Sequence, residues 1–215
     1  MTQKLLAEFI GTALLLIGVV GSGIMGAALA DGNVAIALLA NAIATGCMLY
    51  VIIATLGPVS GAHFNPAVTL AFCIRGSHAW TALLPYVTVQ IAGAIVGVWL
   101  THLMFDLPIL QTGTTARQGL HLWASEVIAT FGLLFVIFGG IRHRPDTVPA
   151  LVGVYITGAY WFTSSTSFAN PAVTIARALS DTFAGVAPGD APMFIVMQLV
   201  GVGVGMLILP RLFTD

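Results

Sequence analysis

Long apolar stretches, separated by short polar segments, run through the whole chain. An α-helix needs about 20 mostly apolar residues to cross a bilayer. Six stretches reach that length and are predicted to be membrane-spanning helices, at roughly 5–28, 34–56, 80–104, 121–141, 148–166 and 191–210. Two further apolar pieces, after Asn65 and after Asn170, reach only about ten residues before a charge or a turn. They are too short to span a bilayer, which predicts a re-entrant half-helix in each place.

The composition agrees with this pattern. Hydrophobic residues make up 58% of the 215 residues and charged residues only 7%, whereas soluble domains carry about 25% charged residues. A surface with so few charges cannot face water. The chain is therefore predicted to be an all-α membrane protein embedded in a lipid bilayer. Its net charge of −1 argues against nucleic acid as a partner.

No set of residues for catalysis or metal binding stands out in the sequence. The five histidines lack the spacing of metal ligands, and Cys47 and Cys73 form neither a disulfide nor a zinc pattern. We expect both cysteines to be small buried hydrophobic side chains. The Gly-rich run at 21–26 ends an apolar span, so it does not fit a dinucleotide-binding loop. We expect no enzyme activity, no cofactor and no metal.

The distribution of Lys and Arg predicts the orientation in the membrane. If both termini lie on one side, that side holds Lys4, Arg75, Arg142, Arg144 and Arg211. The opposite side then holds Arg117, Asp31, Asp106, Asp181 and Asp190. Because positively charged loops stay in the cytoplasm, both termini of this multi-pass protein are predicted to be cytoplasmic.

The two halves of the chain repeat one another. AEFIGTALLLIGVVG at 7–21 is similar to SEVIATFGLLFVIFG at 125–139, and QIAGAIVG at 90–97 matches QLVGVGVG at 198–205. Each half contains three predicted spans, which is an odd number, so the halves must lie in the membrane in opposite orientations. We therefore expect one domain over 1–215, built from inverted repeats at about 1–108 and 119–215, with its functional site between the halves near the midplane.

Each half also contains the sequence Asn-Pro-Ala-Val-Thr. Asn is a preferred N-cap and Pro is favoured at the first helical position, so Asn65-Pro66-Ala67 and Asn170-Pro171-Ala172 each predict a helix start. Inversion lets the two helix N-termini, each with about half a positive charge, meet near the bilayer centre. The capping Asn leaves its amide N–H groups free to donate to a neutral solute, while a cation or proton meets an electrostatic barrier.

The doubled motif, the six-plus-two layout and the matching Glu and Gln positions resemble the major intrinsic protein family, the aquaporins and aquaglyceroporins. SGAHFNPAVT at 60–69 is close to the first signature of that family. The resemblance covers essentially the whole chain. It implies an aquaporin-like fold and a passive pore in each subunit of a homotetramer, with Asn65 and Asn170 as the central donors.

The resemblance also implies roles for three titratable residues. Glu8 and Glu126 would lie behind the pore and accept backbone N–H groups of the two half-helix loops. Membrane carboxylates also serve as proton relays, and that role stays open as an alternative. His63 would line the cytoplasmic vestibule, or else be a loop histidine whose hydrogen bonds are satisfied locally.

The chain departs from the family at the narrowest part of the expected pore. The family normally has Arg three residues after the second Asn. The other three filter positions lie twenty residues before the first Asn, and twelve and three before the second. Here the four residues are Thr45, Gly158, Ser167 and Val173. The fixed cation and the usual bulky side chains are absent, so we expect a wide, neutral and only partly polar filter.

Such a filter predicts passage of small neutral hydroxylated solutes rather than of water alone. With Val173 at the Arg position, the chain resembles the bacterial aquaglyceroporins associated with arsenic resistance. That resemblance implies transport of glycerol-like polyols and of arsenite or small organoarsenicals across the bacterial inner membrane, with water as a further candidate. Arsenous acid is neutral near pH 7 and presents hydroxyl groups as a polyol does.

Arg177 lies four residues after Val173, on the same helix face and one turn further out. It could supply a displaced cation at the extracellular mouth. The simpler expectation is an ion pair with Asp181 at i+4, or a side chain that extends to the membrane surface.

A secondary transporter is the alternative function. Such proteins also use inverted repeats, broken helices and membrane carboxylates, here Glu8 and Glu126. A proton-coupled transporter accumulates solute against a gradient, whereas a channel only equilibrates it. A purely structural protein that packs through its glycines predicts no flux.

Overall fold

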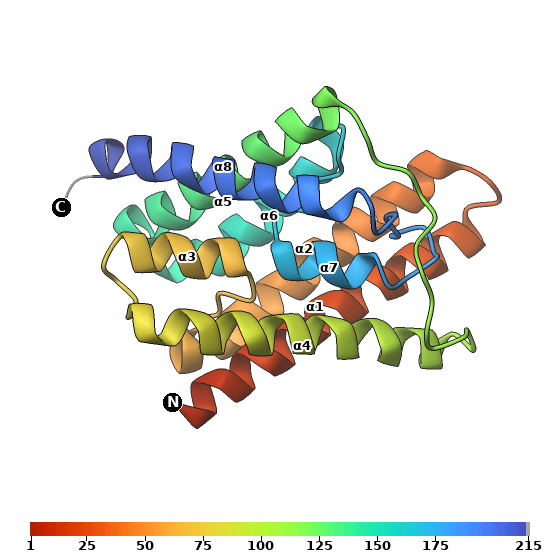
Figure 1. Cartoon of the computed structure of the whole chain (residues 1–215), viewed down its shortest axis with the longest axis horizontal. Coiled ribbons are helices and arrows are strands. Elements are labelled where there is room, and N and C mark those ends of the chain that lie inside the picture. Colours follow the sequence, from red (N-terminus) through yellow and green to blue (C-terminus); the bar gives the residue numbers. More distant parts are fainter. Residues whose placement is uncertain (214–215) are drawn as a thin grey trace.

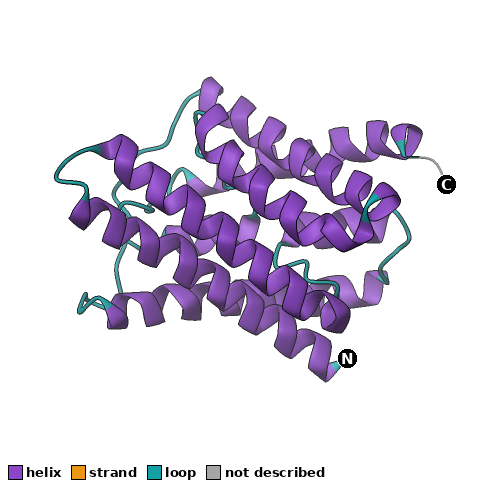
Figure 2. Ribbon diagram, turned by 180° about the vertical axis from the view of Figure 1, so that it is seen from behind, coloured by secondary structure: helices purple, strands orange, loops and turns teal. Residues whose placement is uncertain are grey.

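The computed structural model describes residues 1–213 as a bundle of helices joined by loops, with no strand in that range (Figure 2). The all-helical class predicted from the sequence is confirmed. In chain order the helices are α1 (Thr2–Leu29), α2 (Val34–Ser60), α3 (Pro66–Ile74), α4 (Trp80–Met104), α5 (Leu120–His143), the short 3-10 helix η1 (Pro145–Thr147), α6 (Val148–Phe162), α7 (Pro171–Arg177) and α8 (Ala191–Leu212).

Five of these helices are long and apolar enough to cross a membrane, namely α1, α2, α4, α5 and α8. The sixth predicted span, 148–166, is shorter in the structure. α6 has 15 residues and is about 22 Å long at the usual rise per residue, which is less than the roughly 30 Å of a hydrocarbon core. Residues 163–170 are non-helical and connect α6 to α7.

The two short helices α3 and α7 lie in the interior, where they meet end to end (Figure 1). They have nine and seven residues, and each begins at the Pro of its motif. The Oδ1 atom of Asn65 accepts a hydrogen bond from the N–H of Ala67 at 2.8 Å. The Oδ1 atom of Asn170 accepts one from Ala172 at 3.0 Å. The motif therefore starts both helices as its residue types predict.

Small residues let the long helices pack at close range. A Cβ atom added at Gly97 of α4 would lie 2.4 Å from the carbonyl oxygen of Ala13 in α1. A Cβ atom at Gly153 of α6 would lie 2.6 Å from the carbonyl oxygen of Gly46 in α2. The second contact joins the two halves of the chain. Such small-residue contacts are typical of helices that associate in membranes.

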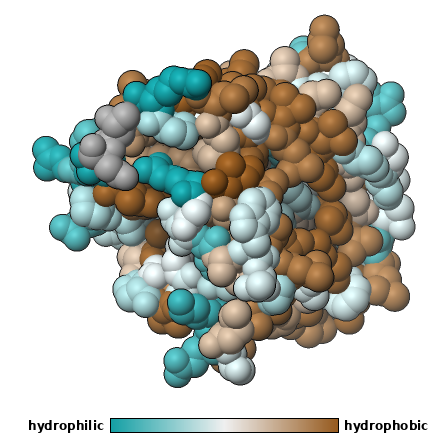
Figure 3. Space-filling view, turned by 60° about the vertical axis from the view of Figure 1, so that its left-hand side comes forward, coloured by the Kyte–Doolittle hydropathy of each residue, from teal (hydrophilic) through white to brown (hydrophobic). Residues whose placement is uncertain are grey.

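Hydrophobic side chains cover a broad part of the face shown in Figure 3, and many large apolar side chains are exposed along the long helices, as expected of side chains that face lipid. The start of α1 and the end of α8 lie at the same end of the bundle (Figure 1). The expectation that both cysteines are buried is right for Cys73 and wrong for Cys47, which is exposed on the outside of α2.

The close contact between α1 and α4 gives a stability prediction. We expect Gly97→Ala to lower the free energy of unfolding by about 1–3 kcal/mol, because the added methyl group overlaps the backbone of Ala13. Gly203→Ala is the matched control, since a Cβ atom there meets nothing within 4 Å. Thermal unfolding in detergent measures both variants, and equal stability of the two would contradict the packing argument.

Candidate functional site: a cavity between two half-helices

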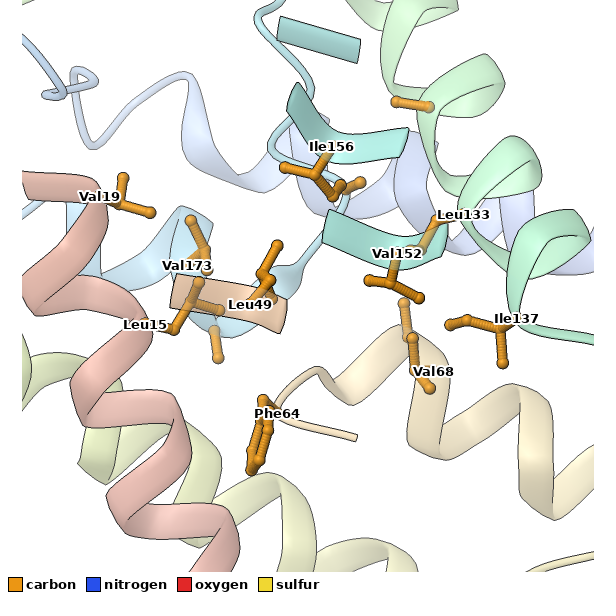
Figure 4. Packing of buried hydrophobic residues seen from close by; sticks show 14 of the residues in the cluster. Leu15, Val19, Leu49, Phe64, Val68, Leu133, Ile137, Val152, Ile156 and Val173 are labelled. Atoms are coloured by element: carbon orange, nitrogen blue, oxygen red, sulfur yellow. The ribbon is translucent and has the colours of Figure 1, made fainter. Parts of the chain in front are cut away.

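A cavity of about 110 Å³ lies between the two halves, which both contribute to its lining. One set of lining side chains is apolar. Figure 4 labels several of its members, among them Leu15, Val19, Val152 and Ile156. The polar lining residues are Thr45, His63, Asn65, Tyr160, Ser167, Asn170 and Arg177. The cavity therefore combines a few hydrogen-bonding groups with a mainly apolar wall, as small-molecule sites do.

The two motif asparagines hold the half-helices together. The Nδ2 atom of Asn65 donates to the carbonyl of Ala169 at 2.7 Å. The Nδ2 atom of Asn170 donates to the carbonyl of Phe64 at 2.8 Å. Each amide has two N–H groups, so one N–H of each is used within the protein and only the other can reach a solute. The expectation that both N–H groups of each amide are free is wrong.

The carboxylate of Glu8 holds the loop that precedes α3. Its Oε1 atom accepts hydrogen bonds from the N–H of His63 at 3.0 Å and the hydroxyl of Ser60 at 2.7 Å. Its Oε2 atom accepts one from the N–H of Phe64 at 2.7 Å and one from Gln90 at 2.8 Å. Glu8 is fully buried, so four donors take the place of the water that burial removes.

Glu126 repeats this arrangement in the second half. It accepts the N–H groups of Phe168 and Ala169, both at 2.9 Å. The hydroxyl of Ser165 and the amide of Gln198 donate to it at 2.6 Å each. The two serines and two glutamines were not among the predicted site residues, although Gln90 and Gln198 lie in the repeated sequence and could have been found from it.

These hydrogen bonds hold an unusual backbone. Ala62 and Phe64 in the first loop, and Ser167 and Ala169 in the second, have φ between 47° and 51°. This left-handed region is uncommon for residues other than glycine. Such residues persist where their surroundings fix them, and they concentrate at functional sites. Here the fixed surroundings are the two buried carboxylates.

The cavity lining differs from the expected filter residues at one position. Gly158 lies on the exposed face of α6 and does not line the cavity. Tyr160, two residues later, lines it instead, and its hydroxyl lies 3.2 Å from the hydroxyl of Thr45. The cavity side of α6 follows a four-residue spacing through Val148, Val152, Ile156 and Tyr160. That spacing in the sequence could have identified Tyr160.

Ser167 and Val173 both line the cavity, as expected of filter residues. The hydroxyl of Ser167 is buried and has no hydrogen-bond partner among the described residues. Val173 is 5% exposed and presents an apolar side chain where a cation is normal in the family.

Arg177 does not form the expected ion pair with Asp181, and it does not extend to the membrane surface. It is 3% exposed and lines the cavity. Its Nε atom donates to the carbonyl of Ala184, and its guanidinium carbon lies 3.5 Å from the centre of the Phe168 ring. Asp181 instead accepts hydrogen bonds from the N–H and hydroxyl of Thr114. The loop after α7 thus turns Arg177 inward.

At the other end of the cavity, His63 is part of an aromatic cluster. Its Nδ1 atom lies 3.2 Å from the hydroxyl of Thr69, which itself donates to the carbonyl of Asn65. These contacts assign the proton to Nδ1, and in the neutral ring Nε2 is then an acceptor. The His78 ring packs edge-on against His63 with 5.1 Å between centroids. Burial lowers the pKa of His78, and the charge of Lys4 lowers it further.

The inverted half-helices, the paired Asn side chains and the cavity between them define a helical membrane channel. The chain belongs to the major intrinsic protein family, whose model matches residues 1–160. It is a passive channel for small solutes and not an enzyme. The family match ends before α7, so the second motif and Val173 lie outside it.

Individual relatives agree with this assignment. The chain is 53% identical over 201 residues to aquaglyceroporin AqpS of Rhizobium meliloti (strain 1021), a match that covers 94% of this chain and 86% of that protein. It is 34% identical over 195 residues to aquaporin NIP2-1 of Oryza sativa subsp. japonica, covering 86% of this chain and 63% of that one.

A solved structure has the same fold. The aquaglyceroporin from Plasmodium falciparum superposes with a TM-score of 0.72 and 18% identity, over 99% of this chain and 98% of that chain. At this identity the likeness shows the fold alone.

Replacing one loop-holding carboxylate tests its structural role. In Glu126→Gln the new NH2 group would face some of the four donors that the carboxylate now accepts. Each buried donor that loses its acceptor costs about 1–3 kcal/mol. We expect lower stability and faster hydrogen exchange at residues 165–170, measured by mass spectrometry.

Thr130→Val is the matched control one turn along α5. The hydroxyl of Thr130 is buried and has no partner among the described residues, so its loss should not weaken the loop. Faster exchange at residues 165–170 in Thr130→Val as well would show that any polar change in α5 has this effect.

Proposed function

We propose that the chain is a pore for small neutral hydroxylated solutes, namely glycerol-like polyols and arsenous acid or small organoarsenicals, with water also able to pass. The observation that carries this proposal is a cavity that combines two Asn donors with a long apolar wall and has Val173 in place of the usual filter cation. The name of the 53% identical relative, an aquaglyceroporin, supports the same class of solute.

The cavity suits a solute with one polar and one apolar side. Asn65 and Asn170 can each donate one remaining N–H to a passing hydroxyl oxygen. Apolar side chains of the same cavity, such as Leu133 and Val152, can contact the C–H groups of a polyol. A bare cation would find donors and no replacement for its hydration shell, so it should be excluded.

The filter that we propose consists of Thr45, Tyr160, Ser167 and Val173, which all line the cavity. Tyr160 makes it narrower and more polar than a filter with glycine at that position. The Thr45 and Tyr160 hydroxyls and the free Ser167 hydroxyl can bind a hydroxylated solute. None of the four side chains carries a charge, so neutral solutes are favoured.

The pore would lie in the plasma membrane, in bacteria the inner membrane, with both termini in the cytoplasm. The common end of α1 and α8 supports termini on one side, and the Lys and Arg distribution supports the cytoplasmic assignment. The family likeness supports a homotetramer with one pore in each subunit.

The alternative of a proton-coupled transporter is less favoured. Glu8 and Glu126 are buried behind the loops, and neither lines the cavity. Four hydrogen bonds to each carboxylate use about all of its acceptor sites. A proton relay needs a group that exchanges protons with the transport path, and these two groups are occupied in holding the backbone.

Restoring the filter cation tests the proposed solute class. Val173→Arg places a long charged side chain in the filter, so we expect glycerol and arsenite fluxes to fall several-fold while part of the water flux remains. Stopped-flow light scattering on proteoliposomes measures water, glycerol and urea, and arsenite uptake is followed in parallel.

Val173→Leu is the control, because it adds bulk without charge. If Val173→Arg left the fluxes of the larger solutes unchanged, the filter assignment would be wrong. If Val173→Leu reduced them as much as Arg does, size rather than charge would explain the selectivity.

A gradient experiment separates the channel from the transporter. In vesicles with an imposed proton gradient, we expect labelled glycerol to reach equal concentrations inside and outside and no more. Accumulation above the external concentration, abolished in Glu8→Gln, would establish the transporter instead.

A further inference from the structure

Two arginines from different parts of the chain meet at one aromatic ring at the end of the cavity away from His63. Arg177 of α7 lies over Phe168 with 3.5 Å between its guanidinium carbon and the ring centre. Arg117, from the loop between α4 and α5, lies 5.2 Å from the centre of the same ring. Phe168, two residues before the motif Asn170, and Arg177 both line the cavity, and Arg117 lies just behind that lining on the same ring.

Neither guanidinium forms an ion pair with a carboxylate within residues 1–213, and Glu126 acts on both only from beyond ion-pair distance. Arg117 donates from its side chain to the carbonyls of Gly185 and Ser165. Asp190 lies nearby, but its carboxylate accepts the backbone N–H of Arg117 and the side-chain amide of Gln118. An unpaired charge is costly to bury, and contact with one aromatic face offsets only part of that cost.

Donors at this end of the cavity also lack acceptors. Nε is the one nitrogen of Arg177 with a hydrogen-bond acceptor among the described residues, so both terminal nitrogens are available. Ser167 is 3% exposed, lines the same cavity, and has a buried hydroxyl without a partner. A ligand that satisfied this set would supply acceptor oxygens and a negative charge, which the Arg fork binds well.

We propose that Arg177 and Ser167, supported by the charge of Arg117, form a binding site for a small monoanion with an oxygen head group. Carboxylates and tetrahedral oxyacid monoanions have this chemistry. The site would collect such anions at the outer mouth, one helical turn outside the neutral filter at Val173. The proposal depends on the proposed pore function only for the location of the site, because anion binding can be measured without any flux.

A matched pair of probes tests the site. Methanesulfonate is an anion at every working pH, and dimethyl sulfone is a neutral molecule of similar shape in which a methyl group replaces the charged oxygen. Both are added together to the protein in neutral-lipid nanodiscs, with empty nanodiscs as blank. Saturation-transfer NMR reads the methyl signal of each probe separately, and we expect transfer to methanesulfonate to be several-fold larger.

Substitutions then locate the binding. Removing the charge in Arg177→Gln should weaken methanesulfonate binding by roughly tenfold, as expected for hydrogen bonds to a charged group. Arg75→Gln is the matched control, because Arg75 also lies over a ring, with 4.7 Å to the centre of Phe138, but does not line the cavity. It should leave binding unchanged.

Other outcomes overturn the proposal. Equal transfer to both probes in the unmodified protein would mean that no anion site exists. An unchanged preference in Arg177→Gln would mean that the anion binds elsewhere. If Arg177→Gln fails to fold, Ser167→Ala and Arg177→Lys test the same site. Each should reduce the preference for methanesulfonate over dimethyl sulfone. Absence of glycerol flux in vesicles would overturn the proposed pore function, but the anion-binding test would still decide whether the site exists.

Discussion

Two buried carboxylates hold the backbone on which every other feature of the cavity depends. Glu8 and Glu126 each bind two consecutive N–H groups of a loop whose left-handed residues would otherwise be unfavourable. These loops end at Asn65 and Asn170, which start the half-helices and bind across to the opposite loop. The two half-sites are therefore coupled, because a shift in one loop removes an acceptor from the Asn of the other.

The internal repeat explains how two irregular loops can be stable within a membrane. Irregular backbone cannot face lipid, since its polar groups would lack partners. In this chain the backbone of each loop finds hydrogen-bond partners in a Ser and a Glu of its own half, and one in the Asn of the other half. A Gln of the same half donates in turn to each Glu. The glycine contacts between α2 and α6 bring the halves close enough for that exchange.

The repeat, the half-helices and the residues that hold them could be predicted from the sequence, because they depend on local helix chemistry and on patterns written twice. The filter could be predicted only in part. Counting back twelve residues from Asn170 gives Gly158, but the face of α6 that borders the cavity carries Tyr160. The inward turn of Arg177 could not be read from an i+4 spacing, since the helix ends at Arg177 and Asp181 lies in the following loop.

Moving the cation one turn outward separates two tasks that one filter Arg would combine. At Val173, an Arg would both narrow the pore and donate hydrogen bonds to the solute. In the proposed pore Tyr160 would supply bulk and the two Asn amides would supply donors, while Arg177 lines the cavity one helical turn beyond Val173. A charge at the outer end of the pore influences which solutes approach it. A neutral filter selects among those solutes by size. Selection by charge and selection by size can then change independently within this fold.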